Sequence, residues 1–458
     1  MKFKKLSLLL AMAITATTFV GCSSKSGDDS AGSDTTGGDK PAAEEQVLKI
    51  AALKGGYGDE FWAPLIEKFE AANEGVKVEV TAESNIEEVI RPQIQAGNVP
   101  DLIYLATSRP EALTETFIKE KALTDLSDVL KMTVPGEDVT VEDKILPGFL
   151  DTTATAPYGD GKTYLAPLFY SPTGLFYNKG LFEEKGYELP TTWDEFFALG
   201  DKAKADGIYL FSYPVAGYFD AVFPAMIAAA GGIDAYNEFN NYGEGFWTGE
   251  VGTKVLKTIG KLKDYIEPSV VSNANGQSFT KNQQLILDNK ALFVPNGNWL
   301  PDEMKDAPRA DGFEWGFMAY PAFEKGGDSY SYNFFEQMYI PADAKNADLA
   351  KKFMAYMYSD EAVEIIAEKA KAAVPVVGAI EIAKNHLEPL QVELLQVYDN
   401  GALPVMGSFV GTEAVEGLDY KAVWCGTIDS IMSGDKTVEQ WQKDLQDATD
   451  KMRAAIIK

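Results

Sequence analysis

The chain has very little cysteine and histidine. Its two cysteines are Cys22 and Cys425, and its one histidine is His386. This composition excludes a disulfide framework and a two-histidine metal site, so we expect no metal ion. A single histidine with no Ser or Cys nucleophile motif beside it also argues against a catalytic triad. We interpret His386 as a surface residue and Cys425 as a small buried apolar residue.

Positive charge is scarce as well. The 69 acidic residues outnumber the 41 basic ones, and the formal net charge is −28. This excess argues against nucleic acid as a partner and against electrostatic docking on anionic lipid. The glycine turn at residues 55–58 fits neither the GxGxxG nor the GxxxxGK[ST] pattern of nucleotide-binding loops. We therefore expect no cofactor.

The apolar segments limit the architecture. With 458 residues, of which 46% are hydrophobic, the chain is long enough for two lobes. Its N-terminal apolar run, residues 6–20, follows three lysines and is too short for a comfortable membrane span, which is typical of a secretory signal. Residues 23–45 are rich in Ser, Gly, Asp and Thr and predict a flexible tether of about 25 Å.

The following segment reads as alternating strands and helices. Strands are expected at residues 47–53, 76–80 and 100–105, with helices at 60–72 and 86–96 and Asp59 as an N-cap. This order predicts an α/β fold with a parallel sheet, whose ligands lie at the carboxyl ends of the strands.

Residues 161–182 are the most informative stretch. They run extended through aromatic and β-branched residues and bend at Pro167 and at residues 171–174, before a helix begins near Asn178. Two strands joined by a kinked segment suit a chain that leaves one sheet and enters another. An ordinary strand–loop–strand unit fits the spacing equally well.

The sequence of this stretch resembles that of a known family. Gly161-Lys162-x-Tyr164, then Leu175-Phe176-Tyr177-Asn178-Lys179, then residues 189–196 (LPTTWDEF) resemble the first lobe crossing of carbohydrate-type extracellular solute-binding proteins. These are the maltose-binding-like receptors of ABC importers, and the resemblance extends from about residue 48 to the C-terminus.

The resemblance implies a two-lobed periplasmic-binding-protein-like α/β fold. Each lobe would hold a mostly parallel sheet flanked by helices, and three hinge crossings would join the lobes, the second at residues 332–341 and the third near 380–388. The implied divisions are a signal peptide (1–21), a lipidated Cys and tether (22–45), lobe I (46–169 plus 334–384) and lobe II (170–333 plus 385–458).

Residues 19–22, Phe-Val-Gly-Cys, resemble a bacterial lipoprotein box, with Phe19 where that pattern usually has Leu. This implies cleavage before Cys22 and lipidation of its thiol. The protein would be extracytoplasmic and lipid-anchored to the bacterial cell membrane, with no other membrane contact.

The resemblance also implies a ligand and a partner. The ligand would be a neutral sugar or short oligosaccharide held between the lobes, and the partner an ABC permease that is a heterodimer or homodimer. The receptor itself would be a monomer. The wording of residues 55–60, GGYGDE, resembles the subgroup that takes N-acetylglucosamine and chitobiose.

Candidate ligand residues follow from sugar chemistry. Aromatic rings match the C–H faces of a sugar, while carboxylates and amides bind its hydroxyl rim. Trp299 follows a strand and Gly297, as in the family's Gly-x-Trp site, and Trp62 is the weakest ring candidate because it or Phe61 must face the core. Each ring has the core as its alternative place. The candidate site is Tyr57, Asp59, Glu83, Asn85, Tyr170, Tyr218, Phe219, Asp220, Trp247, Asn298, Trp299, Glu336, Gln337 and Trp424.

Two other classes of function are alternatives to a receptor. A secreted glycoside-active enzyme needs only two carboxylates, which an acidic chain offers by chance. An adhesive surface protein would show repeats, and none is visible. The crossing pattern and the lipoprotein box favour a receptor over an enzyme.

Overall fold

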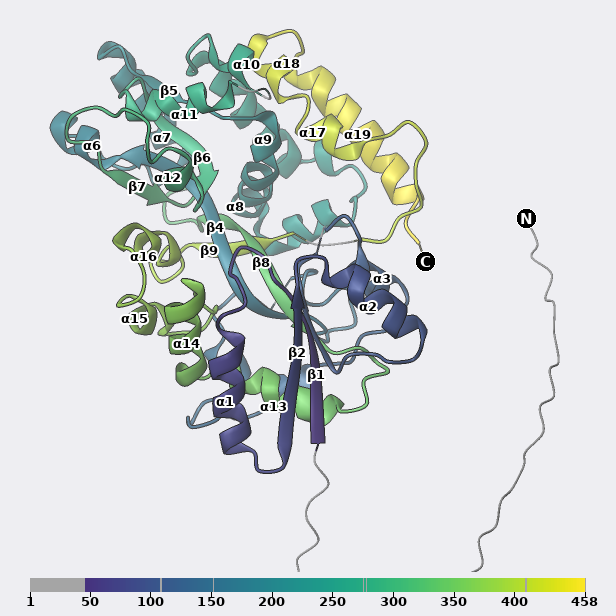
Figure 1. Ribbon diagram of the computed structural model, residues 1–458. Coiled ribbons are helices and arrows are strands. Elements are labelled where there is room, and N and C mark those ends of the chain that lie inside the picture. The colour runs from purple at the N-terminus through teal and green to yellow at the C-terminus, as the bar shows by residue number, and fades with distance from the viewer. Residues whose placement is uncertain are drawn as a thin grey trace, which may run out of the picture. The chain divides into compact units, whose positions relative to one another are not determined.

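The computed structural model describes residues 46–107, 109–150, 152–274, 276, 278–407 and 410–457 (Figure 1). The predicted signal peptide, Cys22 and the tether lie outside these residues.

The described strands alternate with helices. The strands are β1 (Gln46–Leu53), β2 (Val76–Glu83), β3 (Leu102–Leu105), β4 (Ala166–Asn178), β5 (Tyr209–Phe211), β6 (Ala291–Gly297), β7 (Trp315–Met318), β8 (Tyr330–Tyr339) and β9 (Leu403–Met406). The helices up to β6 are α1 (Trp62–Ala72), α2 (Ile86–Gln95), α3 (Leu113–Lys119), α4 (Ser127–Leu130), α5 (Val141–Lys144), α6 (Lys179–Lys185), α7 (Trp193–Ala205), α8 (Phe219–Asn240), α9 (Glu250–Lys261), α10 (Val270–Asn273) and α11 (Phe279–Leu287). The helices after β6 are α12 (Leu300–Glu303), α13 (Ala347–Tyr356), α14 (Asp360–Ala370), α15 (Ala379–Ala383), α16 (Pro389–Leu395), α17 (Tyr420–Trp424), α18 (Ile428–Ser433) and α19 (Val438–Ala454).

The sheet is mixed. Within the described residues the strand order is β2-β1-β3-β8-β4-β6-β5, with β7 paired to β4 and β9 to β8. The first three strands are parallel, as the alternation of strands and helices predicts, and β5 and β6 are also parallel. The long strands β4 and β8 run antiparallel to each other through the middle (Figure 1).

The spacing of residues 161–182 fits either a passage between two sheets or an ordinary strand–loop–strand unit, and the structure of β4 distinguishes the two. The segment is one continuous strand of 13 residues rather than two strands joined by a kink. Its first half pairs with β8, with a register shift between Pro167 and Phe169, and its second half pairs with β6 and β7. The chain therefore does pass from one set of strands to another, and the irregularity after Pro167 shifts the register of β4 without ending the strand.

Two hydrophobic cores flank this passage. The first surrounds β1, β3 and the helices α1, α13 and α14, and the second surrounds α7, α8, α9 and α19. Helix α15 occupies residues 379–383 and packs into the first core, so the third crossing near residues 380–388 stays a prediction. Strand β9 has residues in both cores, since Val405 belongs to the second and Met406 to the first. The predicted lobe boundaries stay a prediction.

Side chains cap several of the helices, including α6 and α7. The spacing of Thr192 and Glu195 predicts an N-cap at Thr192. Thr192 does cap α7, and its hydroxyl accepts a hydrogen bond from the Glu195 N–H at 3.2 Å. Asn178 caps α6 in the same way, its side chain accepting from the Gly180 N–H at 3.0 Å. Asp59 does not cap α1, which begins after Phe61 without a side-chain cap.

Helix α8 is longer than the sequence indicates. The pattern predicts an end at Gly231-Gly232, but Gly232 takes φ 75° and ψ −175°, and helix resumes beyond it to Asn240. Glycine allows this left-handed φ without the steric cost of a Cβ. By length and composition α8 would suit a membrane span, yet most of its apolar residues pack into the second core.

Candidate ligand-binding cleft

A cleft of about 560 Å³ lies where β8 meets the turn after β1, the end of β3, α8 and α17. Because parallel strands end at the same edge of the sheet, the turn after β1 and the end of β3 lie together. Its lining is Tyr57, Ala106, Thr107, Asp220, Pro224, Tyr236, Phe239, Asn240, Tyr242, Tyr332, Asn333, Phe334, Phe335, Glu336, Gly407, Val410, Tyr420, Lys421 and Trp424.

Aromatic side chains dominate the cleft walls. Tyr57 packs against the buried Phe169, with ring centroids 4.5 Å apart. Trp424 contacts Phe239 edge to face at 5.6 Å. Phe334 projects from β8 and is 43% exposed, which is unusual for a phenylalanine at the centre of a sheet. The walls thus offer flat apolar faces, a common feature of sites for sugars.

Trp299 lines a smaller recess of about 20 Å³ that shares Asp220 and Phe334 with the cleft. Its indole N–H donates a hydrogen bond to the Tyr218 hydroxyl at 3.2 Å, and its ring lies 5.7 Å from that of Phe334. A Cβ on Gly297 would come within 2.2 Å of the indole, so the ring rests against bare backbone.

The charged groups of the cleft are mostly paired. The Lys421 ammonium lies 2.6 Å from the Asp220 carboxylate. Glu336 differs, because the Tyr104 hydroxyl donates a hydrogen bond to its carboxylate and no salt bridge of the described residues includes it. Burial raises the pKa of Glu336 to about 7, since a desolvated carboxylate is costly.

The structure brings six of the predicted residues together. Tyr57, Glu336 and Trp424 line the cleft, Tyr218 and Trp299 line the recess, and Asp220 lines both. They come from four separate parts of the chain, the turn after β1, α8 with the turn before it, the segment from β6 to β8, and α17.

Four predicted residues lie in the interior and do not line the cleft. Their places are explained by their neighbours, since the Tyr170 hydroxyl donates to the Leu395 carbonyl and the Trp247 indole N–H donates to the Thr449 hydroxyl. The four are Tyr170, Phe219, Trp247 and Gln337. Trp62, the weakest candidate, is likewise buried in the first core.

The other four predicted residues lie outside both linings. Asp59 pairs with Lys54, and the Asn85 amide donates to Glu88 at 2.9 Å. Glu83 and Asn298 are exposed. Their part in ligand binding stays a prediction.

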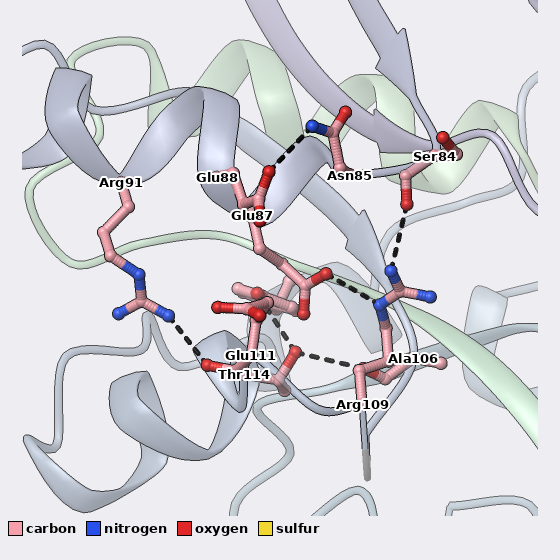
Figure 2. Close-up of polar contacts among 10 residues, drawn as sticks. Ser84, Asn85, Glu87, Glu88, Arg91, Ala106, Arg109, Glu111 and Thr114 are labelled. Atoms are coloured by element: carbon pink, nitrogen blue, oxygen red, sulfur yellow. Dashed lines mark hydrogen bonds and ion pairs between the residues drawn. The ribbon is translucent and has the colours of Figure 1, made fainter.

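Arg109 ties together two loops at the carboxyl edge of the parallel strands (Figure 2). Its Nε donates to the buried Glu87 carboxylate at 2.9 Å, and its guanidinium also donates to the Ser84 carbonyl at 3.1 Å. The Thr114 hydroxyl donates to the Ala106 carbonyl at 3.4 Å on the same loop. Ala106 lines the cleft, so this network holds one cleft wall in place.

Sequence reasoning missed several lining residues. Three of them, Tyr236, Phe239 and Asn240, follow the kink of α8. They were not among the candidates because the helix was predicted to end at Gly231-Gly232. Lys421 was missed as a cation, although its spacing from Trp424 places both on one side of a helical turn. Among the described residues no cluster of His, Cys, Asp and Glu could hold a metal ion.

Comparisons with known proteins agree with this geometry. The family described as bacterial extracellular solute-binding protein matches residues 64–381. The diacetylchitobiose binding protein NgcE of Streptomyces coelicolor is 27% identical over 463 residues, covering 97% of this chain and 94% of that protein. The multiple sugar-binding protein of Streptococcus mutans is 25% identical and covers 71% of this chain and 74% of that protein.

Solved structures show the same fold. The bacterial solute receptor AcbH matches with a TM-score of 0.67 at 20% identity, over 89% of this chain and 100% of that one. The apo form of RafE from Streptococcus pneumoniae matches with a TM-score of 0.64 at 21% identity, over 90% of this chain and 99% of that one. The α/β two-lobed fold class predicted from the sequence is confirmed.

Proposed function

The chain belongs to the bacterial extracellular solute-binding protein family, and from this premise we propose that it binds a neutral sugar or short oligosaccharide and delivers it to an ABC importer. One observation carries the proposal, a cleft of about 560 Å³ walled by aromatic rings and edged by Asp220 and Glu336. Rings cover the C–H faces of a pyranose, and the carboxylates accept hydrogen bonds from its hydroxyls.

The ligand is an N-acetylated amino sugar in this proposal. The relative that covers nearly the whole chain is named for diacetylchitobiose, and the GGYGDE turn that resembles this subgroup supplies Tyr57 to the cleft. The methyl of an acetamido group needs an apolar wall, which Phe334 and Phe239 offer.

Among the described lining residues of the cleft, no cation is free to hold an anionic sugar. Lys421 is the cationic one among them, and it is neutralised by Asp220. We therefore expect isothermal titration calorimetry to show binding of N,N′-diacetylchitobiose and weaker binding of cellobiose. Sugar phosphates and uronates should not bind tightly. Tighter binding of a phosphorylated sugar than of its neutral form would contradict the proposal.

The protein acts as a receptor and not as an enzyme in this proposal. Two carboxylates do line the cleft, so the glycosidase alternative is tested directly by incubating chitooligosaccharides with the protein and measuring reducing ends. We expect binding without release of reducing ends. Sustained release by a purified sample, lost in Asp220→Asn, would favour the enzyme.

The proposed partners follow from the receptor role. The closed receptor would dock as a monomer on an ABC permease heterodimer or homodimer. The proposed lobes keep their predicted boundaries, and closure would bring them together around the ligand because the closed state adds contacts from the second lobe.

A further inference from the structure

Glu336 is the cleft carboxylate without a cationic partner. Asp220 has Lys421 at 2.6 Å, whereas none of the salt bridges among the described residues includes Glu336. The partner that its carboxyl does have is the Tyr104 hydroxyl, which donates to Oε2. An ionised carboxylate in such surroundings is costly, while the protonated form is not.

The groups that face Glu336 come from three other parts of the chain, β3, β4 and the turn after β1. Tyr104 on β3 supplies the hydrogen bond, and Phe169 on β4 is the pairing neighbour of Glu336 on β8. The turn after β1 brings Tyr57, whose own pKa is raised by burial and by the charge of Glu336. The same turn brings Gly55, where a Cβ would lie 3.7 Å from Oε1 of Glu336. The titratable groups among these are phenols and none is a cation.

The second carboxyl oxygen is placed to meet a ligand. Oε2 of Glu336 accepts a hydrogen bond from the Tyr104 hydroxyl, and Oε1 lies beside the glycine turn at the cleft wall. A ligand that fills the cleft removes the remaining water from this oxygen. An uncharged sugar brings no positive charge to replace that water, so its binding favours the neutral acid.

We propose that ligand binding in the cleft is coupled to a proton on Glu336, which binds the ligand as a neutral acid and donates its O–H to a ligand oxygen. The proposal rests on the proposed function of the cleft. The proton comes from solvent when the ligand binds an ionised site and returns to solvent when the ligand leaves. A ligand carbonyl, such as that of an acetamido group, can only accept hydrogen bonds and so matches this donor.

The size of the effect follows from linkage. Because burial sets the pKa of Glu336 at about 7 in the free protein, about half of the molecules must take up a proton when they bind near neutral pH. Affinity should be nearly constant below about pH 6 and about tenfold weaker at about pH 8 than at about pH 6.

The experiment uses calorimetry of the full chain with N,N′-diacetylchitobiose. Titrations at one pH in two buffers of different ionisation enthalpy measure proton uptake, and a pH series measures affinity. Glu336→Gln keeps an amide donor at the same place, so it should hold the low-pH affinity at every pH and take up no proton. Tyr104→Phe removes the donor that favours the charged form and should move the midpoint upward.

His386→Gln is the matched control. It removes the one histidine of the chain, which lies outside the cleft lining. The control should keep the wild-type profile. Affinity that does not change with pH in the wild type, or a pH dependence that survives in Glu336→Gln, would overturn the proposal.

A ligand-free measurement separates this proposal from the proposed function. Carbon-13 labelling of glutamate carboxyls, with Glu336→Gln to assign the signal, reports the titration of Glu336 in the free protein. Titration near the ordinary glutamate value would overturn the coupling whatever the ligand is. Absence of saccharide binding at every pH, with Glu336 still titrating near neutrality, would count against the sugar while supporting the neutral acid.

Discussion

At the scale of single residues, Trp299 shows how a ring in the recess beside the cleft differs from a ring in the core. Trp299 is partly exposed, hydrogen-bonded to Tyr218 and supported by the bare backbone of Gly297. Trp62 is 3% exposed and packs against Phe353 in the first core. The two tryptophans should therefore respond to truncation in opposite ways.

We expect Trp299→Ala to weaken sugar binding by about 5- to 150-fold, equivalent to about 1–3 kcal/mol, with little change in the melting temperature of the free protein. Trp62→Ala should lower the free energy of unfolding by about 3–5 kcal/mol with unchanged affinity per folded molecule. Calorimetry and thermal unfolding on both variants measure this. A Trp299→Ala protein that is strongly destabilised but binds normally would place Trp299 in the core.

The raised pKa of Glu336 also predicts that the stability of the protein depends on pH. Burial raises its pKa from the ordinary 4.5 to about 7, so between these values the folded state binds more protons than the unfolded state. The contribution of Glu336 to the free energy of unfolding is therefore present below about pH 4.5 and is lost as the pH rises toward 7 and beyond.

The expected loss is about 1–3 kcal/mol, because the Tyr104 hydrogen bond offsets part of the desolvation. Urea unfolding of the wild type and of Glu336→Gln at about pH 5 and about pH 8 isolates this difference from the other carboxylates. The variant should lose less stability on going to the higher pH. Equal losses in the two proteins would show that Glu336 is not desolvated.

At the scale of elements, β4 depends on a close approach to β7. A Cβ on Gly174 would lie 2.3 Å from the Met318 carbonyl oxygen and 2.8 Å from the Phe317 ring. Backbone and a packed ring cannot both move aside without separating the strands. The glycine is therefore part of the passage that β4 makes from β8 to its second set of partners.

We expect Gly174→Ala to lower the free energy of unfolding by about 1–3 kcal/mol or more, by overpacking. Gly56→Ala is the matched control, since a Cβ there meets nothing within 4 Å and its stability should be near that of the wild type. Chemical denaturation measures both. A neutral Gly174→Ala would mean that β7 can shift freely, contrary to the packing described.

In helix α8, a single glycine makes the sequence predict a helix that ends too early. Gly232 leaves the helical region at φ 75°, yet Tyr236 beyond it bonds to the Met406 carbonyl and lines the cleft. That contact joins the helix to β9, a strand more than 160 residues later. Local sequence carries no signal of such a distant partner.

At the scale of the whole molecule, the family places the protein outside the cytoplasm, and the anchor at Cys22 is a proposal. We expect Cys22→Ser to move the protein from the membrane fraction to the medium, because one thiol carries the lipid. Fractionation and immunoblotting of both forms measure this. A mutant that remains on the membrane would contradict the anchor, and unchanged sugar binding by the released protein is the control for folding.

The sequence by itself determined the fold class and many of the helices and strands, because these depend on local patterns, and the resemblance of residues 161–196 to known receptors indicated the family. Hydrophobic alternation indicated β1 to β3, Thr192 marked the start of α7, and the stretch around Trp299 predicted a strand that ends at a ligand-facing ring. These signals lie within about ten residues of one another, where periodicity and capping act directly.

Only the tertiary structure decided which candidate residues meet. Phe219 and Trp247 look like site residues in the sequence but are buried in the second core, while Phe334 and Lys421 line the cleft. Whether a ring faces a core or a cleft depends on how two elements far apart in the chain pack against it, and that packing is a long-range property. The raised pKa of Glu336 is of the same kind, since strands from both halves of the chain bury its carboxyl.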